Sequence, residues 1–294
     1  MLAADELATP AVTAADPPST DTASASASPR PPRFTARATF DAIWPKLAAV
    51  AIFLFVWQCV VWSGWKPEYA LPGPRAVGSS LWDITESGLV RRAVGITLQR
   101  AVIGFAASLV IGVAIGLAVS SSKIVRRAIG SMITGIQTMP SIAWFPLAIV
   151  LFQLDEGAIR FVVILGAAPA IANGLITGID HVPPLLLRAG RVIGARGINA
   201  YRYVILPATV PSFVGGLKQG WAFAWRSLMA GELLFTISSK PAIGQQMSQA
   251  RSLSRYSDMI AWMVVVFIIG LFVDAVAFGT LDRAIRRRWG LLTD

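Results

Sequence analysis

Arg226, Glu232 and Asp274 are ionisable residues in stretches that are mostly apolar. Because a charge in the interior of a bilayer is costly, such residues indicate either a structural ion pair or a functional site. Arg226 and Glu232 are about 240° apart around a helix, so we do not expect them to pair with each other. Asp274 is a candidate partner for Arg226. Two interpretations stay open: pairing between neighbouring helices, or lining a polar path through the membrane.

Uncharged polar residues in other apolar stretches could line the same path. An anionic solute needs N–H and O–H donors and a modest positive potential, because it must leave a site as well as enter it. The candidates are Gln137, Thr138, Ser141, Trp144 and Asn173. Trp144 has a second interpretation, since it could pack in the core or at the membrane interface. His181 stands alone, so no metal site is predicted.

A polar, glycine-punctuated segment at 188–211 separates two apolar stretches. Its pattern predicts short helices at 185–195 and 198–206, with a sharp change of direction at Gly194 and Gly197. An amphipathic helix held outside the bilayer can seat its apolar residues in a partner's groove while its charges fix the register. The segment is therefore interpreted as a docking element. The alternative is a solvated amphipathic loop that has no partner.

This segment resembles the cytoplasmic EAA loop of ABC-importer permeases. In that loop an E-A-A triplet is followed by Gly four residues after its last Ala, then by nine residues and the pattern aliphatic-any-Leu-Pro. Two positions differ here, because Arg188 stands in place of Glu and Gly190 in place of Ala. The resemblance implies that the loop couples the chain to an ATPase. The predicted coupling residues are Arg188, Ala189, Gly190, Arg191, Gly194, Ala195, Val204, Leu206 and Pro207.

Three further segments are similar to those of the permease group for sulfonate, taurine, nitrate and bicarbonate. They are 70–74 (ALPGP), 137–146 (QTMPSIAWFP) and 231–233 (GEL). The resemblance implies an all-α membrane protein: a six-helix transmembrane bundle of the type I importer fold, like that of methionine permeases, with a cytoplasmic coupling loop. It also implies cytoplasmic ATPase subunits that hold ATP and magnesium, an extracytoplasmic solute-binding protein, and a second permease copy in a homodimer. Aliphatic sulfonate fits best as the solute, with nitrate, taurine and bicarbonate as alternatives.

The composition is that of a membrane protein. Apolar residues make up 55% of the chain, charged residues make up 14%, and the mean hydropathy is +0.62. In 294 residues, one bundle of five or six spans fits and a separate enzymatic domain does not. The net charge of +10 is concentrated at the ends of the apolar stretches. There it suits membrane orientation and contact with lipid headgroups rather than nucleic acid.

Stretches long enough for a hydrocarbon core about 30 Å thick recur along the chain. Pro140, Pro146 and Pro169 fall within them, and we expect kinks there rather than helix ends, because neighbouring helices can satisfy the freed backbone groups. The second stretch has small residues at every fourth position from Gly104 to Gly116, which predicts close contact with another helix. The predicted spans are 46–64, 97–119, 130–151, 158–178, 212–236 and 258–280, with the coupling loop at 179–211.

Residues 1–45 are predicted to form a disordered cytoplasmic tail ahead of a transmembrane domain at 46–294. The first 32 residues are mostly Ala, Ser, Thr and Pro, which bury too little apolar surface to offset the entropy of ordering. With six spans and a cytoplasmic amino terminus, the inner stretches hold more Lys and Arg than the outer ones. This bias predicts a multi-pass protein of a prokaryotic plasma membrane with both termini in the cytoplasm.

The motifs of an enzyme or an ATPase are absent from the sequence. No G-x-x-x-x-G-K-[ST] motif occurs, so we expect ATP to be bound and hydrolysed by a partner and no cofactor to be held by this chain. The main alternative is a secondary transporter or channel independent of ATP, but no inverted repeat is visible and the docking loop would have no purpose. A membrane enzyme acting on lipid would need several convergent His, Asp or Glu residues in the spans.

Overall fold

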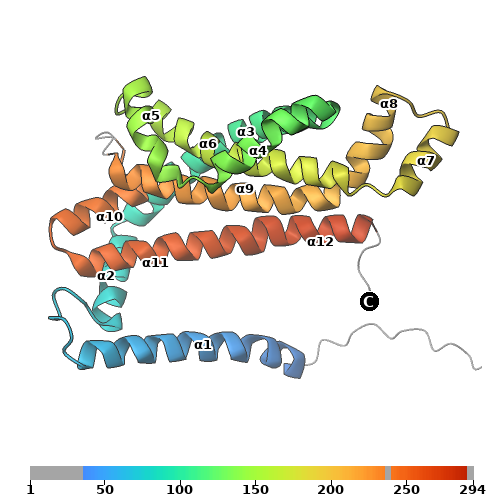
Figure 1. Cartoon of the computed structure of the whole chain (residues 1–294). Coiled ribbons are helices and arrows are strands. Elements are labelled where there is room, and N and C mark those ends of the chain that lie inside the picture. The colour runs from blue at the N-terminus through green and yellow to red at the C-terminus, as the bar shows by residue number, and fades with distance from the viewer. Residues whose placement is uncertain (1–35, 236–239, 290–294) are drawn as a thin grey trace, which may run out of the picture. The chain divides into compact units, whose positions relative to one another are not determined.

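The computed structural model describes residues 36–235 and 240–289, and all regular elements in these ranges are helices (Figure 1). The chain divides into two units, 1–51 and 52–294, and the boundary falls inside helix α1 (Ala36–Trp62). The described part of the first unit is the beginning of this helix. Residues 36–45, which fall in the predicted tail, are the first residues of α1 in the structure. The rest of the predicted tail lies outside the described residues.

Four helical segments in the described ranges are long and apolar enough to cross a membrane. They coincide with the predicted spans 46–64, 97–119, 158–178 and 258–280. The segments are Trp44–Trp62 of α1, α3 (Leu89–Ser121), α6 (Glu156–Asp180) and the continuous stretch Tyr256–Arg288, which consists of α11 (Tyr256–Val273), the π-helical turn η3 (Asp274–Phe278) and α12 (Gly279–Arg288).

The third predicted span, 130–151, is broken rather than kinked. Its two halves meet at 101°, so the prediction that Pro140 only kinks a continuous helix is wrong. Met139 is extended, with φ −70° and ψ 132°, because the ring of a proline drives the preceding residue out of the helical region. The elements are α4 (Lys123–Thr138), the 3-10 turn η1 (Ser141–Trp144) and α5 (Phe145–Phe152).

The fifth predicted span, 212–236, corresponds to α9 (Leu206–Leu234), which is 29 residues or about 44 Å long. Its Lys218, Arg226 and Glu232 lower its hydropathy, and α9 is not among the helices apolar enough to be selected as spans. Hydropathy thus supports four spans, or five if the broken pair counts as one, rather than the predicted six. Length alone would allow α9 to cross as well.

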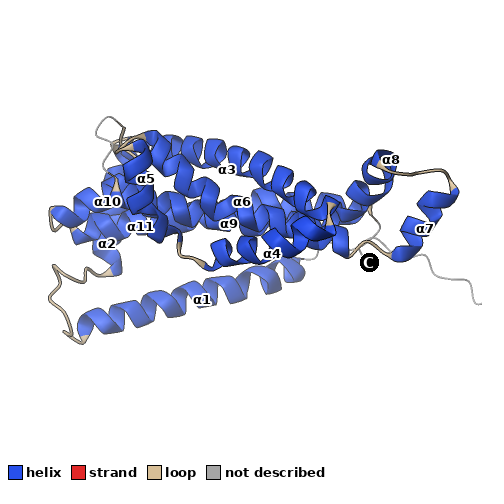
Figure 2. Ribbon diagram, turned by 45° about the horizontal axis from the view of Figure 1, so that its top comes forward, coloured by secondary structure: helices blue, strands red, loops and turns tan. Residues whose placement is uncertain are grey.

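Small residues let α6 pack closely against both α3 and α9 (Figure 2). The predicted ladder on α3 is buried and faces α6: a methyl group added to Gly112 would lie 2.7 Å from the carbonyl oxygen of Ala168. On the other side of α6, a methyl group added to Gly216 of α9 would lie 2.6 Å from Cα of Gly174. Close packing of this kind is typical of helices in membranes, and it confirms the interpretation of the ladder.

The short helices lie at the two ends of this bundle (Figure 1). One end carries α7 (Pro184–Val192) and α8 (Ile198–Ala200), and we call it the α7 end. The opposite end carries α2 (Pro74–Glu86) and α10 (Ile243–Ser252), and we call it the α10 end. There, α2, α10 and α11 share an apolar cluster that includes the buried Trp262.

Candidate functional site

A cavity of about 260 Å³ with a mixed polar and apolar lining lies where the chain breaks between α4 and α5. Because α4 ends before Pro140, η1 turns towards α6 and α9, and residues distant in sequence meet. Leu165 and Gly166 of α6 and Phe223 of α9 complete the wall. We call this space the Arg226 cavity. Five of the residues predicted for a polar path line it: Gln137, Thr138, Ser141, Trp144 and Arg226. Their role in a path stays a prediction, but the structure brings them together.

Arg226 is exposed in the chain, and its charge has no carboxylate partner among the described residues. Its Nε donates a hydrogen bond to the carbonyl oxygen of Ala222 at 3.1 Å, one turn earlier on α9. Its guanidinium carbon lies 4.6 Å from the ring centroid of Phe223, within the range of a cation–π contact. Since these contacts leave donors of the guanidinium open, it could bind an anion.

Arg226 belongs to an exposed stripe along α9, which we call the α9 stripe. Its members recur every three or four residues, so they share one face of the helix. The opposite face is buried and packs against α6, as at Val214 and Leu228. A stripe that ends in a charge is poorly suited to lipid and well suited to an aqueous space. The α9 stripe consists of Ser212, Gly215, Gln219, Ala222 and Arg226.

The predicted pairing of Arg226 with Asp274 is wrong. Asp274 begins η3, and its Oδ1 lies 3.0 Å from Nζ of Lys218 on α9. Lys218 stands eight positions before Arg226, and about 12 Å of helix separates them along the axis. The carboxylate therefore neutralises a different cation of the same helix.

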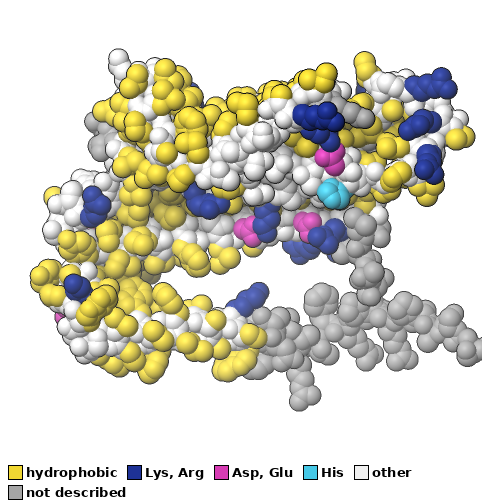
Figure 3. Space-filling model, viewed as in Figure 1, with side chains coloured by type: hydrophobic (Ala, Val, Ile, Leu, Met, Phe, Trp, Pro, Cys, Tyr) yellow, Lys and Arg dark blue, Asp and Glu magenta, His cyan; other side chains and the backbone are white. Residues whose placement is uncertain are grey.

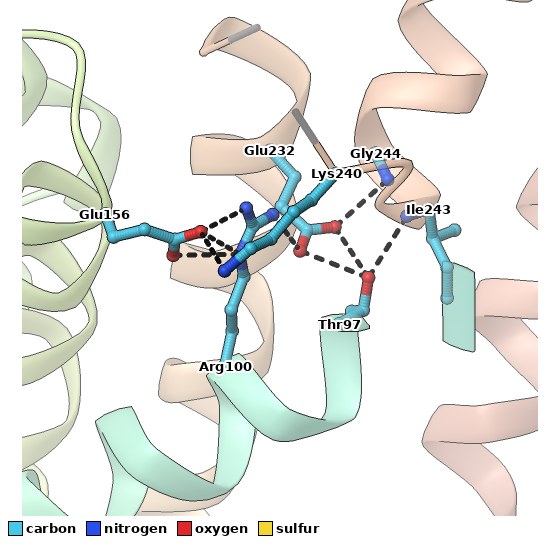
Figure 4. A network of polar contacts seen from close by, with 7 residues as sticks. All are labelled: Thr97, Arg100, Glu156, Glu232, Lys240, Ile243 and Gly244. Atoms are coloured by element: carbon cyan, nitrogen blue, oxygen red, sulfur yellow. Dashed lines mark hydrogen bonds and ion pairs between the residues drawn. The ribbon is translucent and has the colours of Figure 1, made fainter. Parts of the chain in front are cut away.

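Glu232 is enclosed in a buried network near the α10 end and does not line the Arg226 cavity (Figure 4). Nη1 of Arg100 on α3 donates to Oε1 of Glu232 at 3.1 Å. The same guanidinium donates to both carboxylate oxygens of Glu156, the first residue of α6, at 2.6 to 3.2 Å. This fork-like geometry is among the strongest that arginine makes with carboxylates. Glu232 and Arg226 do not pair with each other, which agrees with the prediction.

The same network holds the beginning of α10. Oε2 of Glu232 accepts hydrogen bonds from Thr97 Oγ1 at 2.9 Å and from the backbone N–H of Gly244 at 3.1 Å. Thr97 Oγ1 in turn accepts from the backbone N–H of Ile243 at 3.1 Å. Glu232 and Thr97 therefore each accept from one N–H group at the amino terminus of α10 that has no partner within that helix.

Sequence reasoning missed Arg100, Thr97 and Glu156. Arg100 lies inside the predicted span 97–119, so the argument applied to Arg226 would have selected it as well. Nothing in the sequence pairs it with Glu156, which is 56 residues away and just outside a predicted span. Asn173 is half-buried on α6 and is not among the residues lining the Arg226 cavity.

The predicted coupling loop forms a hairpin at the α7 end. Gly190 of α7 is buried, and a methyl group added to it would lie 2.9 Å from Cγ2 of Val204. Gly194 and Gly197 have φ values of 85° and 55°, in the left-handed region that favours glycine. This confirms the predicted short helix and change of direction. Gly190 stands where the loop of the resembled permeases has Ala. Its close contact with Val204 explains this difference, since a methyl group at this position would not fit unless Val204 moved.

Exposed residues at the tip of this hairpin combine apolar surface with positive charge. Val192, Ile193 and Ile198 are all more than 80% exposed, and Arg188 and Arg191 are exposed beside them. Apolar side chains are exposed here with nothing in the described chain to cover them, which suits a docking surface. Of the remaining coupling residues, Ala189 and Pro207 are exposed, whereas Ala195 and Leu206 are half-buried.

The second loop helix does not end before Pro207. α8 continues through a π-helical turn, η2 (Tyr201–Ile205), into α9, so the hairpin is joined to α9 without a break. Pro207 has no N–H to donate to the preceding turn, and the wider π-helical turn directly before it accommodates the missing hydrogen bond and the proline ring. α8 and α9 are therefore parts of one continuous helical run.

Comparison with known proteins identifies the family of this chain. Residues 108–290 match the family described as binding-protein-dependent transport system inner membrane component. The chain belongs to this family. It is thus an importer permease with several membrane-crossing helices, and residues 108–290 include the Arg226 cavity, the α9 stripe and the coupling loop.

Relatives of this permease have named solutes. It is 29% identical to the nitrate import permease protein NrtB of Synechocystis, over 77% of this chain and 83% of that one. It is also 29% identical to SsuC of Escherichia coli, which is named for the transport of aliphatic sulfonates, over 76% of this chain and 83% of that one. A chain of Methanocaldococcus jannaschii named as an ABC transporter permease is 31% identical over 61% of this chain and 66% of that one.

The fold of the permease is shared with solved importers. It is similar to a chain of the inward-facing MetNI methionine ABC transporter, with a TM-score of 0.60, 20% identity, and coverage of 68% of this chain and 98% of that one. It is also similar to a chain of an amino acid ABC transporter, with a TM-score of 0.56 and 19% identity. The likeness confirms the predicted type I importer fold.

Proposed function

We propose that this permease translocates a small anionic solute across the plasma membrane of a prokaryote. An aliphatic sulfonate is the first candidate, with nitrate, taurine and bicarbonate as alternatives, because relatives of the chain are named for sulfonates and for nitrate. One observation carries the proposal: Arg226 is exposed beside a partly polar cavity and has no carboxylate partner among the described residues. A cation left open in this way attracts an anion without the deep trap that several charges would make.

The surroundings of Arg226 support a path rather than a closed site. Gln137 and Ser141 add neutral donors around the cavity, and the α9 stripe continues the exposed face towards the α7 end. This face is unsuited to lipid, so we propose that it meets a second copy of the chain across an aqueous path. The functional unit in this proposal is a homodimer.

The coupling loop supports an ATP-driven mechanism. In this proposal the α7 end is cytoplasmic, as are both termini, and the tip of the hairpin seats in a cytoplasmic ABC ATPase subunit. That subunit, not the permease, holds ATP and magnesium. The α10 end then faces an extracytoplasmic solute-binding protein. Because the hairpin runs without a break into α9, closure of the ATPase would move the α9 stripe and Arg226 with it.

The anion path is tested with Arg226→Met in the complete importer, reconstituted in liposomes with its ATPase and binding protein. We expect ATP-dependent uptake to fall by about ten- to a hundred-fold, which corresponds to the loss of one charged hydrogen bond. Thermal stability should hardly change, since no ion pair of the described chain is broken. Arg251→Met, at an exposed arginine of α10, is the matched control. Normal uptake in Arg226→Met, with lowered stability, would eliminate the path role.

The docking role is tested separately with Gly194→Trp. The side chain has open space around it, but φ of 85° disfavours any residue other than glycine, so the hairpin should be distorted while the bundle stays folded. We expect co-purification with the ATPase to be lost and the melting temperature of the permease alone to be retained. Ser252→Trp, on an exposed position at the α10 end, is the control. Retained assembly in Gly194→Trp contradicts the docking role.

A further inference from the structure

Lys218 and Asp274 form an ion pair that is open to its surroundings, although both residues lie far from the ends of long helices. The Nζ–Oδ1 distance is 3.0 Å, yet the two side chains are 56% and 48% exposed. Asp274 stands within the apolar stretch Tyr256–Arg288, and Lys218 is in the middle of α9. On the face shown in Figure 3, basic and acidic side chains are interspersed over α9 and α11–α12 between apolar surfaces. The pair joins α9 to the stretch Tyr256–Arg288.

An ion pair that only holds helices together should be enclosed, like the network around Glu232. At membrane depth, half-exposed charges that faced lipid would each be unfavourable, so this pair faces water or a polar partner. Exposed polar residues near Lys218 on α9 support this interpretation: Gln219 is the next residue, and Ser212 lies six residues before it. The pair therefore borders the space that the α9 stripe lines.

Lys218 is also the next cation after Arg226 on the way to the α7 end. The two residues are about 12 Å apart along the axis of α9 and about 80° apart around it, so both lie on its exposed side. Conduction of an ion requires several sites that each bind weakly, so that an ion can pass from one to the next. A lysine suits such a site because its compact charge sits on a flexible stem.

We propose that Lys218 is a second station for a sulfonate or nitrate anion and that Asp274 is its internal counter-ion. In the empty path Asp274 neutralises Lys218. An arriving anion takes over part of the ammonium's contacts, and the return of the carboxylate helps to release it. The rare π-helical geometry of η3 begins at Asp274, and such local widening of a helix often marks functional positions. This inference rests on the anion path proposed above and adds a residue pair to it.

The charge at this station is measured with a thiol placed beside it. Gln219→Cys is made in a Cys59→Ser background, because Cys59 is the one cysteine of the chain and is exposed. The thiol is reacted in membranes with an anionic sulfonate reagent, 2-sulfonatoethyl methanethiosulfonate, and with its trimethylammonium counterpart. One unit charge about 6 Å away in water changes each rate about three-fold, and the ratio of the two rates about ten-fold. Lys218→Met should lower the anion-to-cation ratio, and Asp274→Asn should raise it.

The outcomes separate this inference from the proposed path. If neither reagent reaches the introduced thiol, the α9 stripe does not face water, and both proposals fail. If both reagents react but the ratio is the same in Lys218→Met, in Asp274→Asn and in the parent, only the station at Lys218 is overturned. The proposed path keeps its own test in Arg226→Met.

A charge swap distinguishes a station from a structural pair. Lys218→Asp combined with Asp274→Lys preserves the attraction but places the negative charge on α9. A purely structural pair would keep normal uptake, which would overturn the inference, whereas a station predicts uptake at least several-fold lower. If the swapped protein does not fold, Lys218→Met combined with Asp274→Asn removes both charges and leaves no unpaired one. Reduced uptake by a stable neutral variant supports the station, and normal uptake overturns it.

Discussion

Two arginines of this permease lie within helices of the same bundle, and their surroundings differ in nearly every respect. Arg100 is 8% exposed and is held by two carboxylates, those of Glu156 and Glu232. Arg226 is exposed, touches a carbonyl oxygen and an aromatic ring, and has no carboxylate partner in the described chain. The charge of Arg100 is therefore already neutralised by carboxylates of the chain, whereas the charge of Arg226 is open to an anion from outside the described chain.

The comparison shows why an ionisable residue in a membrane segment is not by itself a functional site. A buried guanidinium without partners would be strongly destabilising, and the two carboxylates around Arg100 remove that penalty. An exposed guanidinium at the border of an aqueous space stays hydrated and needs no internal partner. The role is therefore decided by the enclosure and the partners, which only the fold supplies. Variants at the two sites should separate stability from transport.

The largest effect on stability is expected when the enclosed network around Arg100 is broken. Glu232→Ala leaves Arg100 with one carboxylate and leaves Thr97 and the N–H of Gly244 without their acceptor. Loss of one partner of a buried ion pair typically destabilises by about 3–5 kcal/mol. We expect a clear fall in the temperature at which the purified permease loses its monodisperse state in detergent. Arg226→Met is the matched control and should melt with the parent, and equal melting of Glu232→Ala would contradict the enclosed role.

A smaller loss of stability is expected from crowding the same network. A methyl group added to Gly244 would lie 2.5 Å from Cβ of Glu232 and 2.9 Å from its carbonyl carbon. Gly244→Ala must therefore displace α10 or Glu232, at about 1–3 kcal/mol. Gly78→Ala on α2 is the control, because its added methyl group meets open space and alanine favours helix by about 0.5–1 kcal/mol. If both variants melt alike, the beginning of α10 is not held as tightly as described.

Much of the fold could be predicted from sequence, because long apolar stretches and small-residue ladders report directly on helices and their contacts. The bend at Pro140 was underestimated: membrane helices often absorb a proline, and only the course of α6 and α9 decides that this one ends a helix. The assignment of Asp274 to Arg226 failed for a related reason. Lys218 lies in the same predicted span as Arg226, and the sequence does not show which of the two cations Asp274 meets, because that depends on how α9 packs against its neighbours.

The candidate site, like the fold, was predicted only in part. The cluster around Gln137, Ser141 and Arg226 was predicted from residue type at membrane depth, and the structure does bring these residues to one cavity. The network around Arg100 was not predicted, since its ion pairs join α3 to α6 and to α9 through residues 56 and 132 positions apart. Glu232 was a candidate for the path because it is ionisable within a predicted span, yet its side chain is enclosed by Arg100 and Thr97 and does not line the Arg226 cavity.

The smallest effect is expected for Ser141→Ala, which changes an uncharged residue near Arg226. Ser141 lines the Arg226 cavity and offers one O–H donor, with no charge to lose. A neutral hydrogen bond contributes about 0.5–1.5 kcal/mol, so we expect uptake to fall between about two- and ten-fold. Stability and assembly with the ATPase should stay unchanged. Ser79→Ala, at an exposed position of α2, is the control. If Ser141→Ala transports normally while Arg226→Met does not, the arginine attracts the solute without help from η1, and the cavity wall serves only to admit water.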